Sequence, residues 1–229
     1  MGIVDISISD DIPGVFSARQ KRSVRIRDSF IVVGVDALNQ KRLDDLTISE
    51  LSRSSGNSVG GFYTRFKDKN AYFRALRVFT LHSLEKDHIA DFATLAQSGL
   101  PELDLLDALV DLMVDIFTSR YRGVLRETLL KILDSEDPWA PMRESAVNIV
   151  NIVQANLDES FTGQSIEIEQ TRLRFCFQMI VGVLQNDLVN DYHVHTTRDD
   201  SIRLALKDVV RAYMQLESPA KSTMTVKVS

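Results

Sequence analysis

Residues 46–69 read LTISELSRSSGNSVGGFYTRFKDK, and this stretch decides the fold that the sequence predicts. Thr47 and Glu50 have the spacing of a capping box, in which two side chains satisfy free amides at the start of a helix. Gly56 ends that helix, because the left-handed conformation needed there suits glycine. Ser58 then caps a second short helix. The stretch therefore predicts a helix-turn-helix, whose second helix could enter a DNA groove.

Helices are also predicted on both sides of this stretch. On the N-terminal side, Ser17 and Gln20 predict a capping box at the start of a first helix. Its expected core stripe, at spacings of four, three and four residues, is Ile26, Phe30, Val33 and Ala37. On the C-terminal side, Asp68 is expected to cap a long helix that runs to about Phe92. The first helix and the two helices of the helix-turn-helix would thus form a three-helix domain, which the long fourth helix follows.

The remaining sequence predicts longer helices and no strand outside the chain ends. Apolar residues recur at three- and four-residue spacings, the period of a helix with one buried face. The expected helices cover residues 103–117, 124–133, 142–161, 166–190 and 199–216. An acidic stripe on the first of them is expected to face solvent; it consists of Asp104, Asp107, Asp111 and Asp115. The fold class is therefore all-α.

The predicted helices form two domains between two short arms. Residues 17–68 form the helix-turn-helix, a three-helix DNA-binding domain, and residues 69–217 form a larger helical domain for effector binding and dimerisation. Residues 1–16 and 218–229 are expected to be flexible arms. Each contains a short alternating apolar pattern, but a lone two-stranded ribbon is only marginally stable.

Charge is divided unevenly along the chain. The net charge is −5, yet residues 17–77 hold 13 Lys and Arg against 6 Asp and Glu. Residues 78–229 hold 14 basic against 23 acidic residues. A basic N-terminal block is therefore attached to an acidic body. Only the N-terminal block suits a polyanion such as DNA.

The composition excludes several classes of protein. With 44% hydrophobic and 26% charged residues, the chain is in the globular range. Its first residues carry acidic but no basic side chains, and the apolar stretch 30–38 is too short to span a bilayer. The single cysteine, Cys176, fits a reducing compartment. A cytoplasmic protein without membrane contact is expected. No metal-ligand spacing or catalytic constellation indicates a metal site, a cofactor or an enzyme.

The order of residues 56–69 resembles the DNA-binding signature of the tetracycline-repressor (TetR) family. That signature runs alanine-glycine-valine-serine, a variable residue, glycine-threonine-leucine-tyrosine, two residues, phenylalanine, two residues and lysine. The matching positions, at unbroken spacing, are Gly56, Ser58, Gly60, Tyr63, Phe66 and Lys69. Thr47 also stands where the family opens its second helix. The resemblance is specific, because the later Tyr, Phe and Lys keep step, and it covers about residues 17–77.

The resemblance implies contacts between this domain and the DNA backbone. Thr47 would bind a phosphate from the start of the second helix, and Tyr63 and Lys69 would bind phosphates through their hydroxyl and ammonium groups. Arg22 on the first helix would add non-specific or minor-groove contacts, together with neighbouring basic residues.

Three departures from the signature limit direct reading of bases. Asn57 replaces an apolar residue of the turn, Gly61 replaces threonine, and Arg65 stands where histidine is common. Two adjacent glycines also weaken a helix by about 1 kcal/mol each relative to alanine. Specificity is expected from DNA shape and from Asn57, Ser58, Val59 and Thr64. The predicted DNA-binding residues are Thr47, Asn57, Ser58, Val59, Gly60, Gly61, Tyr63, Thr64, Lys69, Arg22 and Arg65.

The resemblance also implies a small-molecule pocket and a dimer interface made by the last two long helices. Ligand sites have apolar and aromatic linings, and the candidate lining residues are Met113, Phe117, Trp139, Met142, Phe175 and Met179. Helices 166–190 and 199–216 suit antiparallel bundle packing. The expected interface residues are Phe177, Gly182, Leu184, Ile202, Leu206, Val209 and Tyr213. Alternatively, both stripes face only the core of one protomer.

These expectations combine into one functional hypothesis with two rivals. The hypothesis is a ligand-responsive transcriptional regulator, a repressor that binds a palindromic double-stranded operator as a homodimer and is released by a small-molecule effector. The first rival is a small-molecule sensor or interaction module of the same fold without specific DNA binding, which the bare Gly60-Gly61 edge would favour. The second is an enzyme with a site in the helical body, against which the missing catalytic constellation counts.

Overall fold

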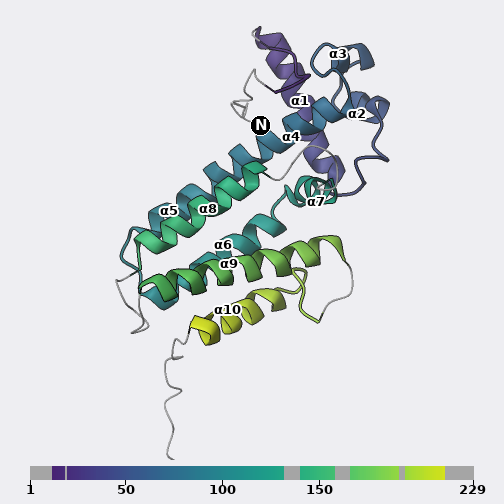
Figure 1. The fold of residues 1–229 in the computed structure, drawn as a ribbon. Helices are drawn as coiled ribbons and strands as arrows, with labels where there is room; N and C mark the ends of the chain where they lie inside the picture. Colours follow the sequence, from purple (N-terminus) through teal and green to yellow (C-terminus); the bar gives the residue numbers. More distant parts are fainter. Residues whose placement is uncertain (1–11, 19, 132–139, 158–165, 191–193, 215–229) are drawn as a thin grey trace, which may run out of the picture. The chain divides into compact units, whose positions relative to one another are not determined.

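The computed structural model describes residues 12–18, 20–131, 140–157, 166–190 and 194–214. Its regular elements in these ranges are helices (Figure 1), and one isolated antiparallel bridge joins Val15 to Phe66. The helices are α1 (Lys21–Leu38), α2 (Ile48–Ser54), α3 (Val59–Tyr63), α4 (Lys69–Leu84), the π-helix η1 (Glu85–Ile89), α5 (Ala90–Ala96), α6 (Glu102–Thr118), α7 (Arg122–Leu130), α8 (Ala140–Ala155), α9 (Ile166–Val189) and α10 (Ser201–Met214). The predicted all-α class is confirmed.

Contacts divide the described chain into two compact units. Unit 1 extends to Asp91 and includes Asp115–Ala146; unit 2 contains Phe92–Val114 and the residues from Val147 onward. Helices α1 to α3 belong to unit 1 with α4 and α7, both of which pack against α1. This division falls elsewhere than the predicted boundary at residue 68. No helix in the described ranges combines the length and apolar character that crossing a membrane requires.

Four aromatic rings form the centre of the helix-turn-helix. Phe30, Phe62, Phe66 and Tyr72 are completely buried, with ring centroids between 5.0 and 6.3 Å apart. Such tilted and edge-to-face pairs add stability beyond the buried area itself. The Tyr72 hydroxyl donates to the Phe30 carbonyl at 2.7 Å. Gly34 permits this crossing of α1 and α4, since a Cβ there would lie 1.8 Å from the Tyr72 hydroxyl oxygen.

The predicted boundaries of the short helices are confirmed. Thr47 and Glu50 form both hydrogen bonds of a capping box at the start of α2. Gly56 has a φ of +68°, the left-handed conformation expected of it. Ser58 caps α3 and Asp68 caps α4, each by accepting from the backbone amide three residues later, at 3.0 and 2.7 Å. These caps fix the length of α3 and the turn before it.

The first helix begins later than predicted. α1 starts at Lys21, and its N-cap residue Gln20 makes no capping hydrogen bond through its side chain, so the predicted capping box of Ser17 and Gln20 is wrong. The buried face of α1 also differs from the predicted stripe; it comprises Arg27, Phe30, Ile31, Gly34, Val35 and Leu38. The reason is tertiary, because α1 packs against α2, α3, α4 and α7 and so buries a wider face.

Residues 12–16 are placed against the turn between α3 and α4. The Phe16 amide donates to the Arg65 carbonyl, and the Lys67 amide donates to the Gly14 carbonyl, both at 2.8 Å. The expectation that residues 1–16 form a flexible arm is therefore wrong for residues 12–16. Residues 1–11 and the expected tail 218–229 lie outside the described ranges.

The long helix predicted to run from Asp68 to about Phe92 contains a change of hydrogen bonding. α4 ends at Leu84, the wider turn η1 follows, and α5 continues to Ala96. A π-turn is closed by hydrogen bonds that reach one residue further than those of an α-helix, so η1 is a local widening between α4 and α5. The boundary between the two units follows η1 by two residues.

In unit 2, charge pairs join α6 to α10. Arg211 forms an ion pair with Asp107, and Asp111 accepts from Arg203 and Lys207 at 2.8 Å each. Burial alone would raise the pKa of Asp111, but Lys207 and Arg203 outweigh it and hold this pKa below its usual range. The prediction that the acidic stripe simply faces solvent is therefore wrong for Asp107 and Asp111.

Candidate nucleic-acid interface

α2 and α3 pack against α1 and leave one edge of α3 at the surface (Figure 1). Phe62 is completely buried and anchors the helix, whereas Val59 is 42% and Tyr63 50% exposed. Ser58, Gly60 and Thr64 are exposed as well. The residues predicted to lead into a DNA groove therefore share an exposed edge, apart from the exceptions described next.

Asn57 is turned toward α1 instead of the exposed edge. Its amide nitrogen donates to the Ser29 hydroxyl at 2.8 Å and to the Ser55 carbonyl at 2.9 Å. The side chain thereby ties the turn to α1. This explains why a polar residue can replace the apolar one of the family signature. The predicted base-reading role of Asn57 does not fit this arrangement, since its donors are already used.

The hydroxyl groups at the two ends of α3 serve the helix itself. The Ser58 hydroxyl oxygen accepts from the Gly61 amide at 3.0 Å, and the Thr64 hydroxyl donates to the Gly61 carbonyl at 2.7 Å. Both side chains remain exposed, but their first role is to cap a helix of only five residues. Isolated helices of this length do not form in water, so these caps and the Phe62 anchor sustain α3.

Neither glycine of α3 is required by packing within the protein. A Cβ built on Gly60 would meet only the Ser58 hydroxyl oxygen, at 3.8 Å, and one built on Gly61 would meet nothing closer than 3.5 Å. These are ordinary contact distances. Both glycines also have backbone conformations open to other residues, because neither has a positive φ. The packing of the described residues therefore requires a glycine at neither position.

Arg65 contacts the N-terminal segment. Its guanidinium donates to the Ser17 carbonyl at 2.9 Å, and its own carbonyl accepts from the Phe16 amide. The side chain is half-buried. The structure thus places Arg65 as a support for residues 16 and 17, in place of the predicted contact with DNA.

Lys69 holds the loop between α1 and α2. Its ammonium group donates to the carbonyls of Leu43, Asp44 and Leu46 at 2.9, 3.0 and 3.1 Å. An ammonium group has three donors, and all three are used here. The structure therefore gives Lys69 a different role from the predicted phosphate contact, that of fixing the loop from which α2 starts.

Glu127 on α7 holds the same loop from the other side, a feature that the sequence did not reveal. This carboxylate is 2% exposed and accepts from the Leu43 amide at 3.1 Å and from the Arg42 guanidinium at 2.8 Å. Arg126 donates to the carbonyls of Leu38 and Lys41 at 2.8 and 2.9 Å. We call Glu127 and Arg126 with these contacts the loop clamp. In the sequence, the sign of this clamp is the adjacent charged pair Arg126-Glu127 within the largely apolar stretch 124–133.

The start of α2 carries a strongly ionised carboxylate. The Lys41 ammonium nitrogen lies 2.6 Å from a carboxylate oxygen of Glu50. The hydrogen bonds from Lys41 and Thr47 lower the pKa of Glu50 to about 2. Thr47 is exposed beside it. The capping box therefore persists at every pH near neutrality and keeps Thr47 at the surface, where the resemblance implies a phosphate contact.

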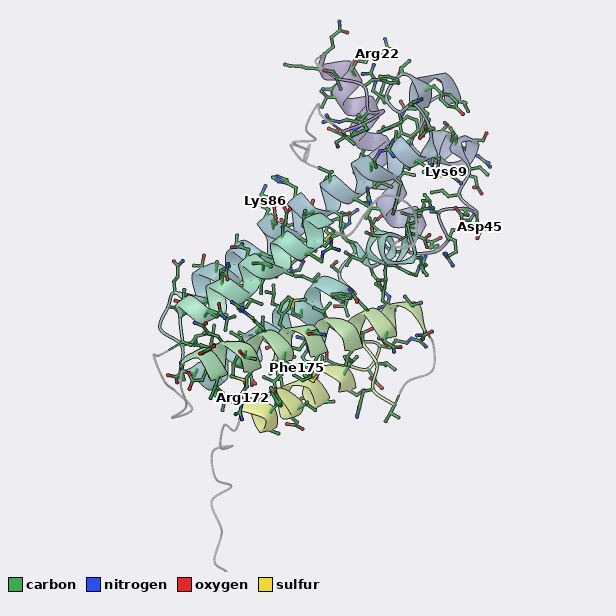
Figure 2. The ribbon with its side chains drawn as sticks, in the orientation of Figure 1. Arg22, Asp45, Lys69, Lys86, Arg172 and Phe175 are labelled. Atoms are coloured by element: carbon green, nitrogen blue, oxygen red, sulfur yellow. The ribbon has the colours of Figure 1, made fainter. Side chains whose placement is uncertain are left out.

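Basic residues extend this surface along α1. Lys21, Arg22 and Arg25 are exposed in its first turns. Figure 2 labels Arg22 and Lys69, which both belong to the predicted DNA-binding head, the region from α1 to the start of α4. Arg19 lies outside the described ranges. Within those ranges no group of three His, Cys, Asp or Glu residues is arranged to hold a metal ion.

The residues predicted to line an effector pocket are distributed over both units. Met113 and Met179 belong to unit 2, whereas Phe117 and Met142 belong to unit 1. Met113 and Phe117 are buried, and Met142 and Met179 are half-buried. Trp139 lies outside the described ranges. A hollow of about 440 Å³ lies between α1 and α2, but none of these residues lines it.

Phe175, which was predicted to line the pocket, lies at the surface of unit 2. It is 49% exposed on α9, and its ring lies 5.3 Å from that of Tyr213 on α10. The guanidinium of Arg172 lies 5.7 Å from the centroid of the same Tyr213 ring. Figure 2 labels Phe175 and Arg172, both on α9. Phe175 is therefore part of the outer face of unit 2 and not an internal wall.

The predicted dimer residues divide into a buried and an exposed group. Phe177, Leu184, Ile202 and Leu206 are buried within unit 2 itself. Gly182, Val209 and Tyr213 are exposed. On α9 a further exposed row recurs every seven residues, formed by Ile168, Phe175, Gly182 and Val189. A seven-residue apolar repeat along one side is typical of a helix that packs lengthwise on another helix.

The fold of the chain is similar to those of several solved structures. A structure of a protein classed as a TetR-family transcriptional regulator from Mesorhizobium loti matches with a TM-score of 0.65 and 14% identity, covering 86% of this chain and 98% of the other. One from Rhodococcus sp. matches with a TM-score of 0.58 and 14% identity, covering 82% and 98%. Salmonella enterica GusR matches with a TM-score of 0.56 and 11% identity, covering 87% and 100%. No protein-family model and no curated protein sequence matches this chain. From its capped helix-turn-helix to its C-terminal helices, the chain has the fold of the TetR-family transcriptional regulators.

Proposed function

We propose that this chain is a DNA-binding transcriptional regulator that acts as a homodimer and responds to a small molecule. The observation that carries the proposal is the exposed edge of α3, which is capped at both ends and braced by buried aromatic rings. Thr47, Tyr63 and Arg22 would supply phosphate contacts. Lys69 would act indirectly, by fixing the loop before α2. The TetR-type fold and the basic charge of residues 17–77 support the same function.

Selection of bound duplexes from a random DNA pool tests the proposal. We expect an enriched palindromic motif, because two heads related by two-fold symmetry read two half-sites. Tyr63→Phe should weaken binding to all sequences by a similar factor. Arg22→Ala should lower the slope of log affinity against log salt by about 0.9 for each phosphate that the variant no longer neutralises. Lys86→Ala is the matched control, since Lys86 is exposed on η1 and outside the proposed interface.

Two outcomes would contradict DNA binding through α3. The first is a folded protein that retains no duplex from the pool at low salt. The second is an Arg22→Ala variant with the same salt slope as the parent and as Lys86→Ala. The first result would overturn DNA binding itself, and the second would move the interface away from α1.

The proposed homodimer interface is the exposed apolar row of α9 with Val209 and Tyr213 of α10. Val209→Asp would bury a charge against apolar side chains of the second copy, which costs several kcal/mol without a partner. We expect monomers in analytical ultracentrifugation. Leu204→Asp is the control, because Leu204 is 66% exposed on a different side of α10. A Val209→Asp dimer as stable as the parent would place the interface elsewhere.

The proposed effector is an apolar small molecule bound by the helical body, with Met113 and Met179 as candidate contacts. Its binding would favour a state in which the two heads cannot dock together, so DNA would be released and transcription derepressed. A ligand screen by thermal shift should find compounds that both stabilise the protein and lower its DNA affinity. Compounds that stabilise it without any effect on DNA affinity would argue against this coupling.

A second function is a sensor of the same fold without specific DNA binding. The observation that favours it is the edge of α3, where Gly60 and Gly61 offer no side chain. Pool selection that enriches no motif, from a protein that still dimerises and binds ligands, would support this alternative.

A further inference from the structure

The exposed edge of α3 offers few groups that could read bases. Gly60 and Gly61 have no side chain and Phe62 is completely buried, so Val59 and Tyr63 are the exposed side chains within α3. Tyr63 stands at the end of the helix, where the phosphate contact is proposed. Val59 stands at its first position. The N-terminal residues of a recognition helix are those that approach base edges.

The polar neighbours of Val59 already make hydrogen bonds within the protein. The amide of Asn57 binds Ser29 and Ser55, the Ser58 oxygen accepts the α3 amide of Gly61, and the Thr64 hydroxyl donates to a carbonyl of α3. The two-point (bidentate) reading of bases uses Arg, Lys, Asn or Gln side chains, and residues 58–64 contain none of these. The exposed side chain at the first position of α3 is the apolar one of Val59.

Base edges in the major groove carry one apolar group, the 5-methyl of thymine. Resting on the DNA-binding function proposed above, we infer that Val59 recognises a thymine 5-methyl in each half-site. Gly60 and Gly61 allow this contact to form. Nothing within the fold requires them to be glycines. Without side chains they let the backbone of α3 approach the groove closely enough for the short Val59 side chain to reach the methyl.

The test replaces thymine by deoxyuridine, which lacks only this methyl. In an operator obtained by pool selection, each thymine is replaced in turn and affinity is measured by fluorescence anisotropy. We expect one position per half-site where replacement costs about fourfold, the effect of ~0.8 kcal/mol for one methyl group at tenfold per 1.4 kcal/mol. Replacement in both half-sites should cost about fifteenfold.

Val59→Ala identifies the residue responsible. Because Val59 is exposed, the variant should fold with an unchanged melting temperature, and it should bind thymine and deoxyuridine operators equally. Val147→Ala is the matched control, since Val147 is an exposed valine on α8 in unit 2. It should keep the fourfold preference for thymine.

The outcomes separate this inference from the function on which it rests. Specific, salt-dependent binding with no deoxyuridine-sensitive position overturns the thymine contact and leaves DNA binding intact. A Val59→Ala variant that keeps the full preference overturns the assignment to Val59. A folded protein that binds no DNA overturns both proposals.

Discussion

Glu127→Gln should test the loop clamp between α7 and the α1–α2 loop. One carboxylate oxygen accepts from the guanidinium groups of Arg42 and Arg126, at 2.8 and 3.2 Å, and the other accepts from the Leu43 amide at 3.1 Å. Glutamine has nearly the same shape but only one acceptor oxygen. Its amino group must therefore face either the guanidinium groups or the buried Leu43 amide, so at least one donor is left without an acceptor.

The expected fall in stability follows from these hydrogen bonds. Breaking a buried charge pair costs about 3–5 kcal/mol. The Arg42 side chain is 50% exposed and can turn to water, which reduces the cost. The Leu43 amide has no such escape, and leaving a buried donor unpaired costs about 1–3 kcal/mol. We therefore expect the free energy of unfolding to fall by about 2–4 kcal/mol.

Urea unfolding followed by circular dichroism measures this change, because guanidinium chloride would screen the ion pairs. Glu144→Gln is the control; Glu144 is exposed on α8, and its replacement should change stability by less than about 0.5 kcal/mol. Hydrogen exchange of the Leu43 amide should also accelerate in the Glu127→Gln variant. Stability within about 0.5 kcal/mol of the parent, with unchanged exchange at Leu43, would refute the clamp.

Three further predictions concern single sites. Gly34→Ala should lower the free energy of unfolding in urea by about 1–3 kcal/mol or more, because its methyl would lie 1.8 Å from the Tyr72 hydroxyl oxygen. An unchanged free energy of unfolding would contradict the close crossing of α1 and α4. The pKa of the Glu50 carboxyl should be about 2 by NMR and should rise in Lys41→Ala, while staying below its ordinary value because the hydrogen bonds from Thr47 remain. Because its folded pKa is lowered, its stabilising effect is present above about pH 4.5 and is lost as the pH falls toward 2. Cys176 is buried, which raises the pKa of its thiol to about 11, so a thiol reagent should modify it rapidly only after unfolding; fast reaction of the folded protein would contradict its burial.

The features of the head that were predicted correctly are caps and turns, which form between residues close together in the sequence. The capping box of Thr47 and Glu50, the glycine turn at Gly56 and the caps at Ser58 and Asp68 all act over three residues or fewer. Their spacing is therefore visible in the chain itself. The capping box at Ser17 failed although it had the same spacing. The Ser17 carbonyl binds Arg65, 48 residues away, and the helix starts later.

Contacts between distant residues decided the roles of the polar side chains. Asn57, Arg65 and Lys69 were all expected to face DNA, and each is held by a residue more than twenty positions away. The acidic stripe of α6 pairs with α10 across about a hundred residues. No local pattern records such partners, because a polar residue has the same appearance in the sequence whether solvent or a carbonyl binds it.

By itself, then, the sequence determined the all-helical class, the boundaries of α2 and α3 and the bare edge at Gly60 and Gly61. These follow from capping, helical period and side-chain size, which are local properties. Only the tertiary structure decided that Asn57 faces α1, that Lys69 and the loop clamp hold the loop before α2, and that Phe175 is exposed. These depend on which surfaces meet when the helices pack, a property of the whole fold.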